Sequence, residues 1–516
     1  IMTARRYTLI LIGDLLYFLS ITVTFRALIV EGASRKIQIL LLSTWLVVLL
    51  SIIILIYLGI KQKSDWLFAG SKELSKRIVG VNTWVRGIIF ITITLLPVLF
   101  IYTDIDRGLM GNTAFRFLVY IPLIIIAALF FPAKEPECFR AKLAISAMTV
   151  AYILMAALYL NQISQFPLSL SWSEGNRFYD YSLVFGQDMY QYEGELNIPY
   201  GAPGRYGLWG IWFLFPELSI GFHRAWNAVL WFLPTLIFGW FAAVGISSKP
   251  VRFGIALWVA LFLNQGPIYA PLVIAAIIVA IPLLKQPIWI RSVSAGLASL
   301  YAGLSRWTWF AIAGVWGALI DLGIYYPKRP GKWYQRLLPV FILALVGSLP
   351  GLFANANRFL TPKSSTLSLS QPLLLYRLLP NVTYEPGILL GFLLAVGAPL
   401  ILVGWLVLSK RWVMDWLQFV AFAGVGITLF IAGMVASAKI GGGSNLHNLD
   451  MFLVTLVFVI GIYFAAGNEF KPSDWPLWVQ AFVILAILVP VWNPLTNKSS
   501  LNLPTNEDAR IAIEKI

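Results

Sequence analysis

Carboxylates crowd one polar stretch of an otherwise apolar chain. They lie in segment 163–223, between two hydrophobic runs, and include Glu174, Asp180, Asp188, Glu193 and Glu195. Partial desolvation at a membrane surface raises the pKa of a carboxyl group, which suits the group to accept a proton from a reacting hydroxyl. Glu174 is the first candidate for this chemistry and Asp180 the second. The alternatives are that Glu174 is a solvated carboxylate or the ion-pair partner of Arg177, and that Asp180 is a surface acid.

Arg306 is a candidate for binding an anion at a membrane surface. It stands between two apolar runs in AGLSRWTWF and is flanked by Trp307 and Trp309. An arginine supplies a planar set of donors that matches phosphate oxygens without a metal. A cation on a short interfacial turn is costly and usually functional, although an arginine that extends to lipid headgroups is the competing interpretation.

Lys439 opens a second candidate anion site, in KIGGGSNLHNLDMF at 439–452. Consecutive glycines let the backbone approach a ligand and present its amide groups. The polar residues that follow include Asn445, His447, Asn448 and Asp450. The pattern predicts a phosphate-binding or sugar-binding loop. It is also compatible with a glycine-rich turn in which Asp450 is the N-cap of the next helix.

The sequence offers few residues for holding a metal. It has two histidines, His223 and His447, and one cysteine, Cys138. A zinc site needs more ligands of these kinds than two distant imidazoles provide. Asp104 and Asp106 form an Asp-x-Asp pattern, for which chance is the simpler explanation. We therefore predict no metal ligand and no required cofactor; a divalent metal is possible, but no residue set supports it.

The elements that must position these residues are membrane-spanning helices. Hydrophobic side chains make up 59% of the 516 residues and charged ones 12%, and the mean hydropathy is +0.80. Continuous apolar runs, such as the one at 37–60, exclude a transmembrane barrel, whose strands alternate apolar and polar residues. The net charge of +15 comes from basic residues scattered between apolar runs, so a nucleic-acid partner is not expected. The sequence predicts an all-α polytopic bundle with membrane lipids around it, and with short interfacial helices in the long outer loop 163–223.

The hydrophobic pattern predicts about 13–15 spans, because some runs are short enough to be broken or re-entrant helices. The predicted spans are 7–30, 37–60, 80–102, 115–131, 143–162, 224–244, 253–264, 270–284, 292–304, 307–325, 337–353, 384–409, 416–436, 451–467 and 475–493.

The distribution of basic residues predicts the orientation. With the N-terminus in the cytoplasm, the inner loops hold most of the Lys and Arg, as in YPKRPGKWYQR at 326–336, in agreement with the positive-inside rule. The extracytoplasmic face then holds Arg306 and the segments 163–223, 354–383 and 437–450. Loops that converge on one face of a bundle are where a polytopic enzyme keeps its site; the alternative is that they are linkers.

Two motifs in segment 163–223, and the helix after it, resemble the GT-C superfamily of integral-membrane glycosyltransferases. The likeness is to the family of protein O-mannosyltransferases and the lipid A aminoarabinose transferase. Ser173-Glu174-Gly175-Asn176-Arg177-Phe178-Tyr179 resembles that family's Asp-Glu motif, with Ser173 where the family usually has Asp. Pro203-Gly204-Arg205-Tyr206-Gly207-Leu208-Trp209 resembles its Pro-rich segment, and Arg224 its Arg-led second core span. The glycine-rich segment after Lys439 resembles one found late in bacterial members.

The resemblance predicts three regions. Residues 1–142 are an added membrane module of extra helices, 143–330 are the GT-C-like core with the catalytic loop 163–223, and 331–516 form a C-terminal transmembrane region with outer loops 354–383 and 437–450. It further implies a bacterial-type plasma (inner) membrane enzyme with an extracytoplasmic site.

The implied activity is transfer of a sugar from a polyprenyl-phosphate-type lipid donor to an acceptor, which is a glycan, a lipid or a protein, with inversion at the sugar C1. Glu174 would be the base. The expected substrate-binding residues are Arg177, Asp180, Arg205, Tyr206, Arg306, Lys439, Asn445 and His447. A flippase or polymerase for lipid-linked saccharides would share the bundle and its basic outer sites, and a non-catalytic membrane subunit would leave the outer loops without a pocket. Both alternatives remain open at this point.

Overall fold

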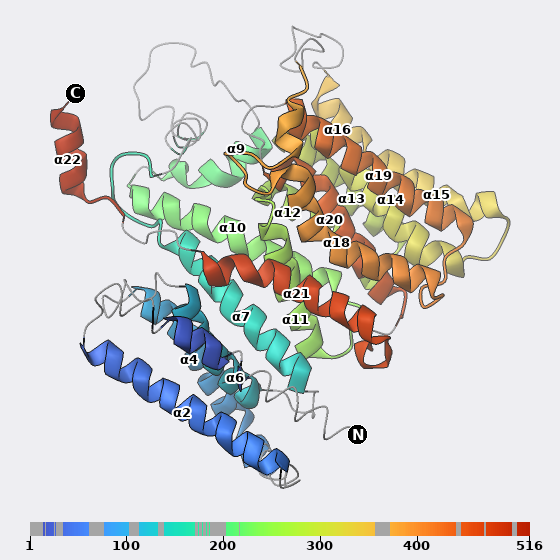
Figure 1. Cartoon of the computed structure of the whole chain (residues 1–516). Coiled ribbons are helices and arrows are strands. Elements are labelled where there is room, and N and C mark those ends of the chain that lie inside the picture. The colour runs from blue at the N-terminus through green and yellow to red at the C-terminus, as the bar shows by residue number, and fades with distance from the viewer. Residues whose placement is uncertain are drawn as a thin grey trace. The chain divides into compact units, whose positions relative to one another are not determined.

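Helices make up nearly all the regular structure of the protein, as its computed structural model shows (Figure 1). Among the residues described, an isolated bridge between Asn381 and Tyr384 is the only strand-like pairing. The predicted all-α fold is therefore confirmed. The structure describes residues 14–15, 17–24, 26, 35–60, 77–102, 113–132, 139–170, 174, 178, 182, 185, 203–215, 217–356, 372–439, 445–468, 471–497 and 503–515.

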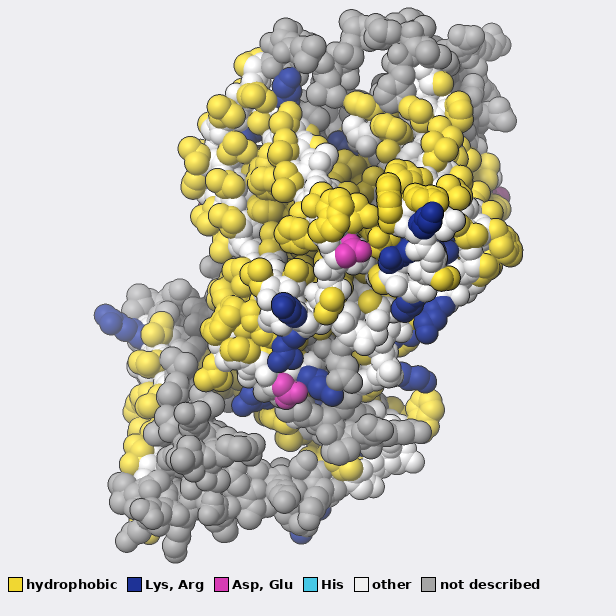
Figure 2. Space-filling model, turned by 90° about the vertical axis from the view of Figure 1, so that its right-hand side faces the viewer, with side chains coloured by type: hydrophobic (Ala, Val, Ile, Leu, Met, Phe, Trp, Pro, Cys, Tyr) yellow, Lys and Arg dark blue, Asp and Glu magenta, His cyan; other side chains and the backbone are white. Residues whose placement is uncertain are grey.

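Long apolar helices make this a multi-pass helical membrane protein. In the described part of the chain, nine helices are long and apolar enough to cross a membrane, and shorter apolar helices cover Leu41–Tyr57, Phe115–Phe130 and Ala270–Leu284. Figure 2 shows broad surfaces of hydrophobic side chains, interrupted by groups of Lys and Arg and by few Asp or Glu. Such surfaces are stable when lipid rather than water covers them.

The chain divides into two compact units. The smaller comprises residues 1–154 and 492–499, and the larger comprises residues 155–491 and 500–516. Two of the three divisions fall inside helices, namely α7 (Phe139–Leu160) and α21 (Leu477–Thr496).

The smaller unit contains α2 (Arg35–Ile60), α4 (Thr83–Tyr102), α6 (Thr113–Phe130) and most of α7. Its apolar core includes Ile21, Leu41, Val48, Ile52 and Leu118. Two polar side chains among these helices pair with other helices, whereas the buried Tyr120 hydroxyl of α6 pairs with no described group. The Asp14 carboxylate accepts a hydrogen bond from Ser51, and the Tyr17 hydroxyl donates to the Leu118 carbonyl at 2.8 Å.

The larger unit is a bundle in which successive long helices reverse direction. Its helices before the turn at 329–332 are α9 (Pro203–Gly210), η2 (Ile211–Leu214), α10 (Ile220–Ala242), α11 (Lys249–Asn264), α12 (Ala270–Ala280), η3 (Ile281–Leu284), α13 (Ile288–Ser305), η4 (Trp307–Trp309), α14 (Ile312–Ile320), the π-helical turn η5 (Asp321–Tyr325) and η6 (Tyr326–Lys328). After it come α15 (Trp333–Val346), α16 (Leu349–Ala354), η7 (Leu375–Leu378), α18 (Gly387–Leu408), α19 (Trp416–Lys439), η8 (Leu446–Leu449), α20 (Asp450–Ala465), η9 (Pro472–Asp474), most of α21, and α22 (Asn506–Glu514).

Helix α20 forms the centre of this unit, and most of its residues are buried. The Phe458 ring packs against Phe238 of α10 and Trp316 of α14, with ring centroids 5.0 Å apart in each case. The Trp316 indole donates to the Thr455 hydroxyl at 2.8 Å. This buried hydrogen bond thus adds a specific contact between α14 and α20.

Because the helices alternate in direction, their connections gather at two ends of the larger unit. We call them the Arg306 end and the Arg329 end. At the Arg329 end the Tyr325 hydroxyl donates to the Pro282 carbonyl at 2.6 Å, and the Gln418 amide donates to the Leu322 carbonyl at 2.8 Å. The Arg306 end comprises α9, the connection from α11 to α12, the turn at Arg306, and η8.

A buried aspartate joins three elements at the Arg329 end. The Asp321 carboxylate is fully buried and binds the Arg291 guanidinium of α13 and the Arg329 guanidinium after η6. Arg329 contributes two bonds, Nη1 to Oδ1 at 2.6 Å and Nη2 to Oδ2 at 2.7 Å. The Arg291 guanidinium also lies over the Tyr325 ring, 3.9 Å from its centroid. This cluster fixes the turn that follows α14.

Candidate functional site

Glu174 forms a two-point ion pair with Arg224 near the start of α10. Arg224 Nε donates to Glu174 Oε1 at 3.1 Å, and Arg224 Nη2 donates to Oε2 at 3.2 Å. The Leu170 backbone amide donates to Oε2 at 2.6 Å. The side chains are 12% and 2% exposed for Glu174 and Arg224 respectively. Two parallel bonds fix the position and the plane of the carboxylate.

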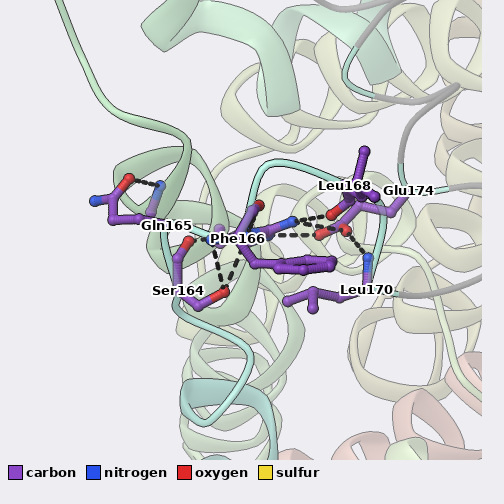
Figure 3. A network of polar contacts seen from close by, with 8 residues as sticks. Ser164, Gln165, Phe166, Leu168, Leu170 and Glu174 are labelled. Carbon is purple, nitrogen blue, oxygen red and sulfur yellow. Dashed lines mark hydrogen bonds and ion pairs between the residues drawn. The ribbon is translucent and has the colours of Figure 1, made fainter. Parts of the chain in front are cut away.

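Arg224 also ties down the segment before Glu174, as the dashed lines in Figure 3 show. Its Nη1 donates to the carbonyls of Ser164 at 2.9 Å and Phe166 at 2.8 Å, and its Nη2 donates to the Leu168 carbonyl at 3.0 Å. The first residues of α10 are oriented locally, because the Ser219 hydroxyl caps the helix by accepting from the Phe222 amide. One arginine thus holds three carbonyls and a carboxylate.

The beginning of α10 also supports α9. The Trp226 indole donates to the Leu208 carbonyl of α9 at 2.9 Å. The His223 ring stacks on Phe213 of η2, with centroids 3.9 Å apart and planes 12° apart. Phe178, four residues after Glu174 in the chain, contacts both rings, with centroids 6.4 Å from each. The rings of Phe178, Phe213 and His223 therefore pack together beside both the Glu174–Arg224 pair and α9.

Gly204 brings two arginines to one place. A methyl group on Gly204 would lie 2.6 Å from the Ser305 hydroxyl and 2.9 Å from the Ser305 backbone nitrogen, so the backbones of α9 and α13 touch at this position. Arg205 and Arg306 are the next residues on the two chain segments. Only glycine permits this close approach.

Arg205 packs against aromatic rings rather than against a carboxylate. Its guanidinium lies 4.5 Å from the Tyr269 centroid and 5.1 Å from the Trp209 centroid. Its Nε is buried and pairs with no group in the described part of the chain. The Tyr269 ring lies 6.4 Å from the His447 ring, which connects α9 to η8 across the Arg306 end.

Arg306 and η8 complete the cluster. Arg306 Nη1 contacts Asp450 Oδ2 at 3.4 Å, and the Trp309 indole donates to the same oxygen at 3.1 Å. The Arg306 side chain is 28% exposed, whereas that of Asp450 is 2% exposed. Asn445 Oδ1 accepts from the His447 backbone amide at 3.0 Å and contacts its ring at 2.9 Å. We call Arg205, Tyr269, Arg306, His447 and Asp450 the cationic cluster.

Two further features adjoin this cluster. The Asn448 side chain is buried in η8, and neither of its amide atoms pairs with a described group. A cavity of about 590 Å³ lies beside α9; its lining is almost wholly apolar and includes Gly204, Gly207, Trp212, Trp226, Ile274 and Tyr301. Its walls come from α9, η2, α10, α12 and α13.

The predicted site residues separate into groups. The structure brings Arg205, Arg306, Asn445 and His447 together at the Arg306 end. Tyr206 instead packs into an apolar core with Trp209, Leu230 and Ala270. Lys439 is half-buried and is the last residue of α19. Arg177 and Asp180 lie outside the described residues.

Two contributors to this region were not predicted from the sequence. Arg224 was expected only as the start of a span, yet it is the ion-pair partner of Glu174. Tyr269 was not a site candidate, whereas Asn448 was expected among the polar residues that follow the glycines. Tyr269 stands between Gly266 and Pro271, in a short break between two apolar runs, and this could have marked it as a residue at a helix boundary.

The comparisons add no identification. No family model matches the chain, no characterised protein matches its sequence, and no solved structure matches its fold. Among the described residues, no three His, Cys, Asp or Glu side chains form a group that could hold a metal ion. The site must therefore be interpreted from its own geometry.

Proposed function

We propose that this protein is a membrane glycosyltransferase that uses a polyprenyl-phosphate-linked sugar as its donor. The observation that carries the proposal is the convergence of Arg205, Arg306 and His447 at one end of a membrane bundle, although they lie far apart in the sequence. Arg205 has a buried, unpaired Nε, and Arg306 is only loosely paired. These guanidinium donors suit the oxygens of a lipid phosphate.

The apolar cavity beside α9 supports a donor with a hydrocarbon tail. It reaches Gly204 on α9 and Tyr301 on α13, one residue and five residues before Arg205 and Arg306 respectively. Its volume of about 590 Å³ lies in the range of ligand pockets, which is about 300–1,000 Å³. A phosphate at the two arginines would place the first part of its lipid chain in this cavity.

Glu174 is suited to accept the proton of the acceptor. Oε1 accepts one hydrogen bond, from Arg224, so it retains a lone pair for a second. In the proposed step the acceptor oxygen attacks the sugar C1 and its proton passes to Oε1. The bond from C1 to the phosphate oxygen breaks, and the polyprenyl phosphate leaves with the electron pair, stabilised by Arg205 and Arg306. Attack from the side opposite the phosphate inverts C1.

The charge of the two ends supports an extracytoplasmic site. Basic residues at the Arg329 end include Lys249, Lys285, Lys328, Arg329, Lys332, Arg336, Lys410 and Arg411. The positive-inside rule would place that end in the cytoplasm. The cationic cluster would then face the outside of the plasma (inner) membrane.

The test uses purified protein and a radiolabelled polyprenyl-phosphate sugar, with release of the sugar as the readout. Arg205→Gln and Arg306→Gln should each raise the apparent KM for the donor at least tenfold, because a charge-assisted bond contributes about 1.5–3 kcal/mol. Arg252→Gln is the matched control, since Arg252 also lies over an indole ring, that of Trp240, at the other end of α10. Glu174→Gln should keep donor binding and lose transfer.

Two results would reject the proposal. One is full transfer by Glu174→Gln. The other is an unchanged KM in both Arg205→Gln and Arg306→Gln. Donor binding without any sugar release from the unaltered protein, across the sugars tested, would favour a flippase or a non-catalytic subunit instead.

A further inference from the structure

A second apolar groove lies between α18, α19 and α20. It has a volume of about 560 Å³. Its residues are almost entirely hydrophobic and include Val403, Gly404, Phe422, Gly426, Leu456 and Val459. A methyl group on Gly404 or Gly426 would meet no atom within 4 Å, so both glycines face open space.

The groove is accessible from the surface of α19. Phe419 and Ile427 both line it, and they are 54% and 59% exposed. Its far end is closed by ring contacts of Phe392 with Phe430 at 4.8 Å and with Phe452 at 5.3 Å. On α18 the lining runs from Phe392 to Leu408, which is about 24 Å of helix.

Basic and aromatic residues mark the open end of the groove. Lys410 and Arg411 directly follow the last lining residues of α18 and are exposed. The Arg411 guanidinium lies 5.3 Å from the Trp405 centroid, and Trp405 contacts Trp475 at 5.0 Å. Tryptophan gathers at the depth of lipid headgroups. This end of the groove therefore lies at a membrane interface with positive charge.

We infer that the groove binds an anionic phospholipid of the bilayer, with one acyl chain between α18 and α19 and the phosphate at Lys410 and Arg411. The charge of the two residues complements the phosphate. Lys410 and Arg411 lie at the Arg329 end, away from the cationic cluster, so this phosphate site is separate from the proposed donor site. The inference does not depend on the proposed glycosyltransferase activity.

The backbone at Lys410 allows a test that separates charge from folding. Lys410 adopts the left-handed conformation, with φ of 57°, which glycine tolerates better than lysine. Lys410→Gly should therefore keep or improve folding while it removes one charge. Lys285 has the same conformation, with φ of 59°, at the same end of the unit and outside the groove lining. Lys285→Gly is thus a matched control.

The experiment is native mass spectrometry of the purified protein with added phosphatidylglycerol or phosphatidylcholine. The unaltered protein should retain phosphatidylglycerol and should retain phosphatidylcholine far less. Lys410→Gly should weaken phosphatidylglycerol binding about fivefold, since a basic residue near an anionic lipid contributes about 1 kcal/mol, whereas Lys285→Gly should leave it unchanged.

A second pair of variants tests the acyl chain. Gly404→Leu/Gly426→Leu should fill the groove and reduce phosphatidylglycerol binding at least tenfold. Gly397→Leu should not, because Gly397 also faces open space on α18 but does not line the groove. Equal binding of the two lipids, or undiminished binding after filling, would overturn the inference. If the filled variant kept phosphatidylglycerol binding but lost polyprenyl phosphate binding, the groove would hold the donor tail. That result would overturn the inference as well.

Discussion

The two ends of the larger unit each bury an aspartate beside arginine, but they pair it differently. At the Arg329 end, both oxygens of Asp321 bind guanidinium groups, with the bonds to Arg329 at 2.6 and 2.7 Å. At the Arg306 end, Asp450 has one longer contact to Arg306, at 3.4 Å. Arg205 contacts aromatic rings and pairs with no carboxylate among the described residues.

The difference indicates which cations are available to a ligand. The Arg329 guanidinium donates to the buried Asp321 carboxylate and to the Arg336 carbonyl at 2.9 Å. The cluster around Asp321 therefore has a structural role. Arg205 and Arg306 retain donor capacity, and Arg306 is partly exposed. Residue type alone does not distinguish the two ends, whereas the number and length of the bonds do.

The largest effect should come from disrupting the cluster around Asp321. Asp321→Asn should cost about 3–5 kcal/mol of unfolding free energy, because it leaves Arg291 buried without its counter-charge. Denaturant unfolding in detergent measures the change. Asp415→Asn is the control at the same end. Asp415 caps the start of α19 by accepting from the Gln418 backbone amide at 2.8 Å, and its replacement should lower the unfolding free energy by about 1 kcal/mol or less. If both variants lost the same unfolding free energy, the Asp321 cluster would stabilise the protein no more than the Asp415 helix cap does.

The sequence was sufficient to predict the helical elements of the fold. The predicted span at 384–409 is α18, Gly387–Leu408, and the predicted span at 270–284 is α12 with its extension η3. Long apolar runs are a local property of the sequence. Each spanning segment must form its own backbone hydrogen bonds and be apolar along its length. Orientation depends on charge outside the helices, and it remains a prediction.

The site was predictable only as separate residues. Arg306, His447 and Arg205 were candidates because of their types and neighbours, but their association depends on contacts across the chain. Arg306 and Asp450 are 144 residues apart, and Glu174 and Arg224 are 50 apart. Such pairings are set by tertiary packing, including the approach of Gly204 to Ser305, and no local pattern encodes them. Tyr206 illustrates the limit, since its motif predicted substrate contact and its side chain packs in an apolar core.

The next largest effect should come from separating the two arginines of the cationic cluster. Gly204→Ala places a methyl group against the Ser305 backbone, so α9 must move away from α13 and Arg205 from Arg306. The KM for the lipid donor should rise about tenfold. Gly207→Ala is the control on the same helix and the same cavity wall, because its added methyl group would meet only Phe185, at 3.9 Å. If both variants or neither changed the KM, the close approach at Gly204 would have no role in donor binding.

The smallest effect tests whether the loose pairing of Asp450 competes with a ligand. In Asp450→Asn, the negative charge is lost and one side-chain oxygen remains. Only one of two hydrogen bonds can then persist, either from the Trp309 indole, which donates to Oδ2, or from the Met451 backbone amide, which donates to Oδ1. Because one buried donor loses its acceptor, the unfolding free energy should fall by about 1–3 kcal/mol. The donor should bind about threefold to fivefold more tightly, since a like charge beside its phosphate is removed. Titration of the purified variant with polyprenyl phosphate measures this affinity, with unaltered protein beside it. Weaker binding would mean that Asp450 holds Arg306 in position for the phosphate, and the two ends would then differ in geometry but not in the availability of their cations.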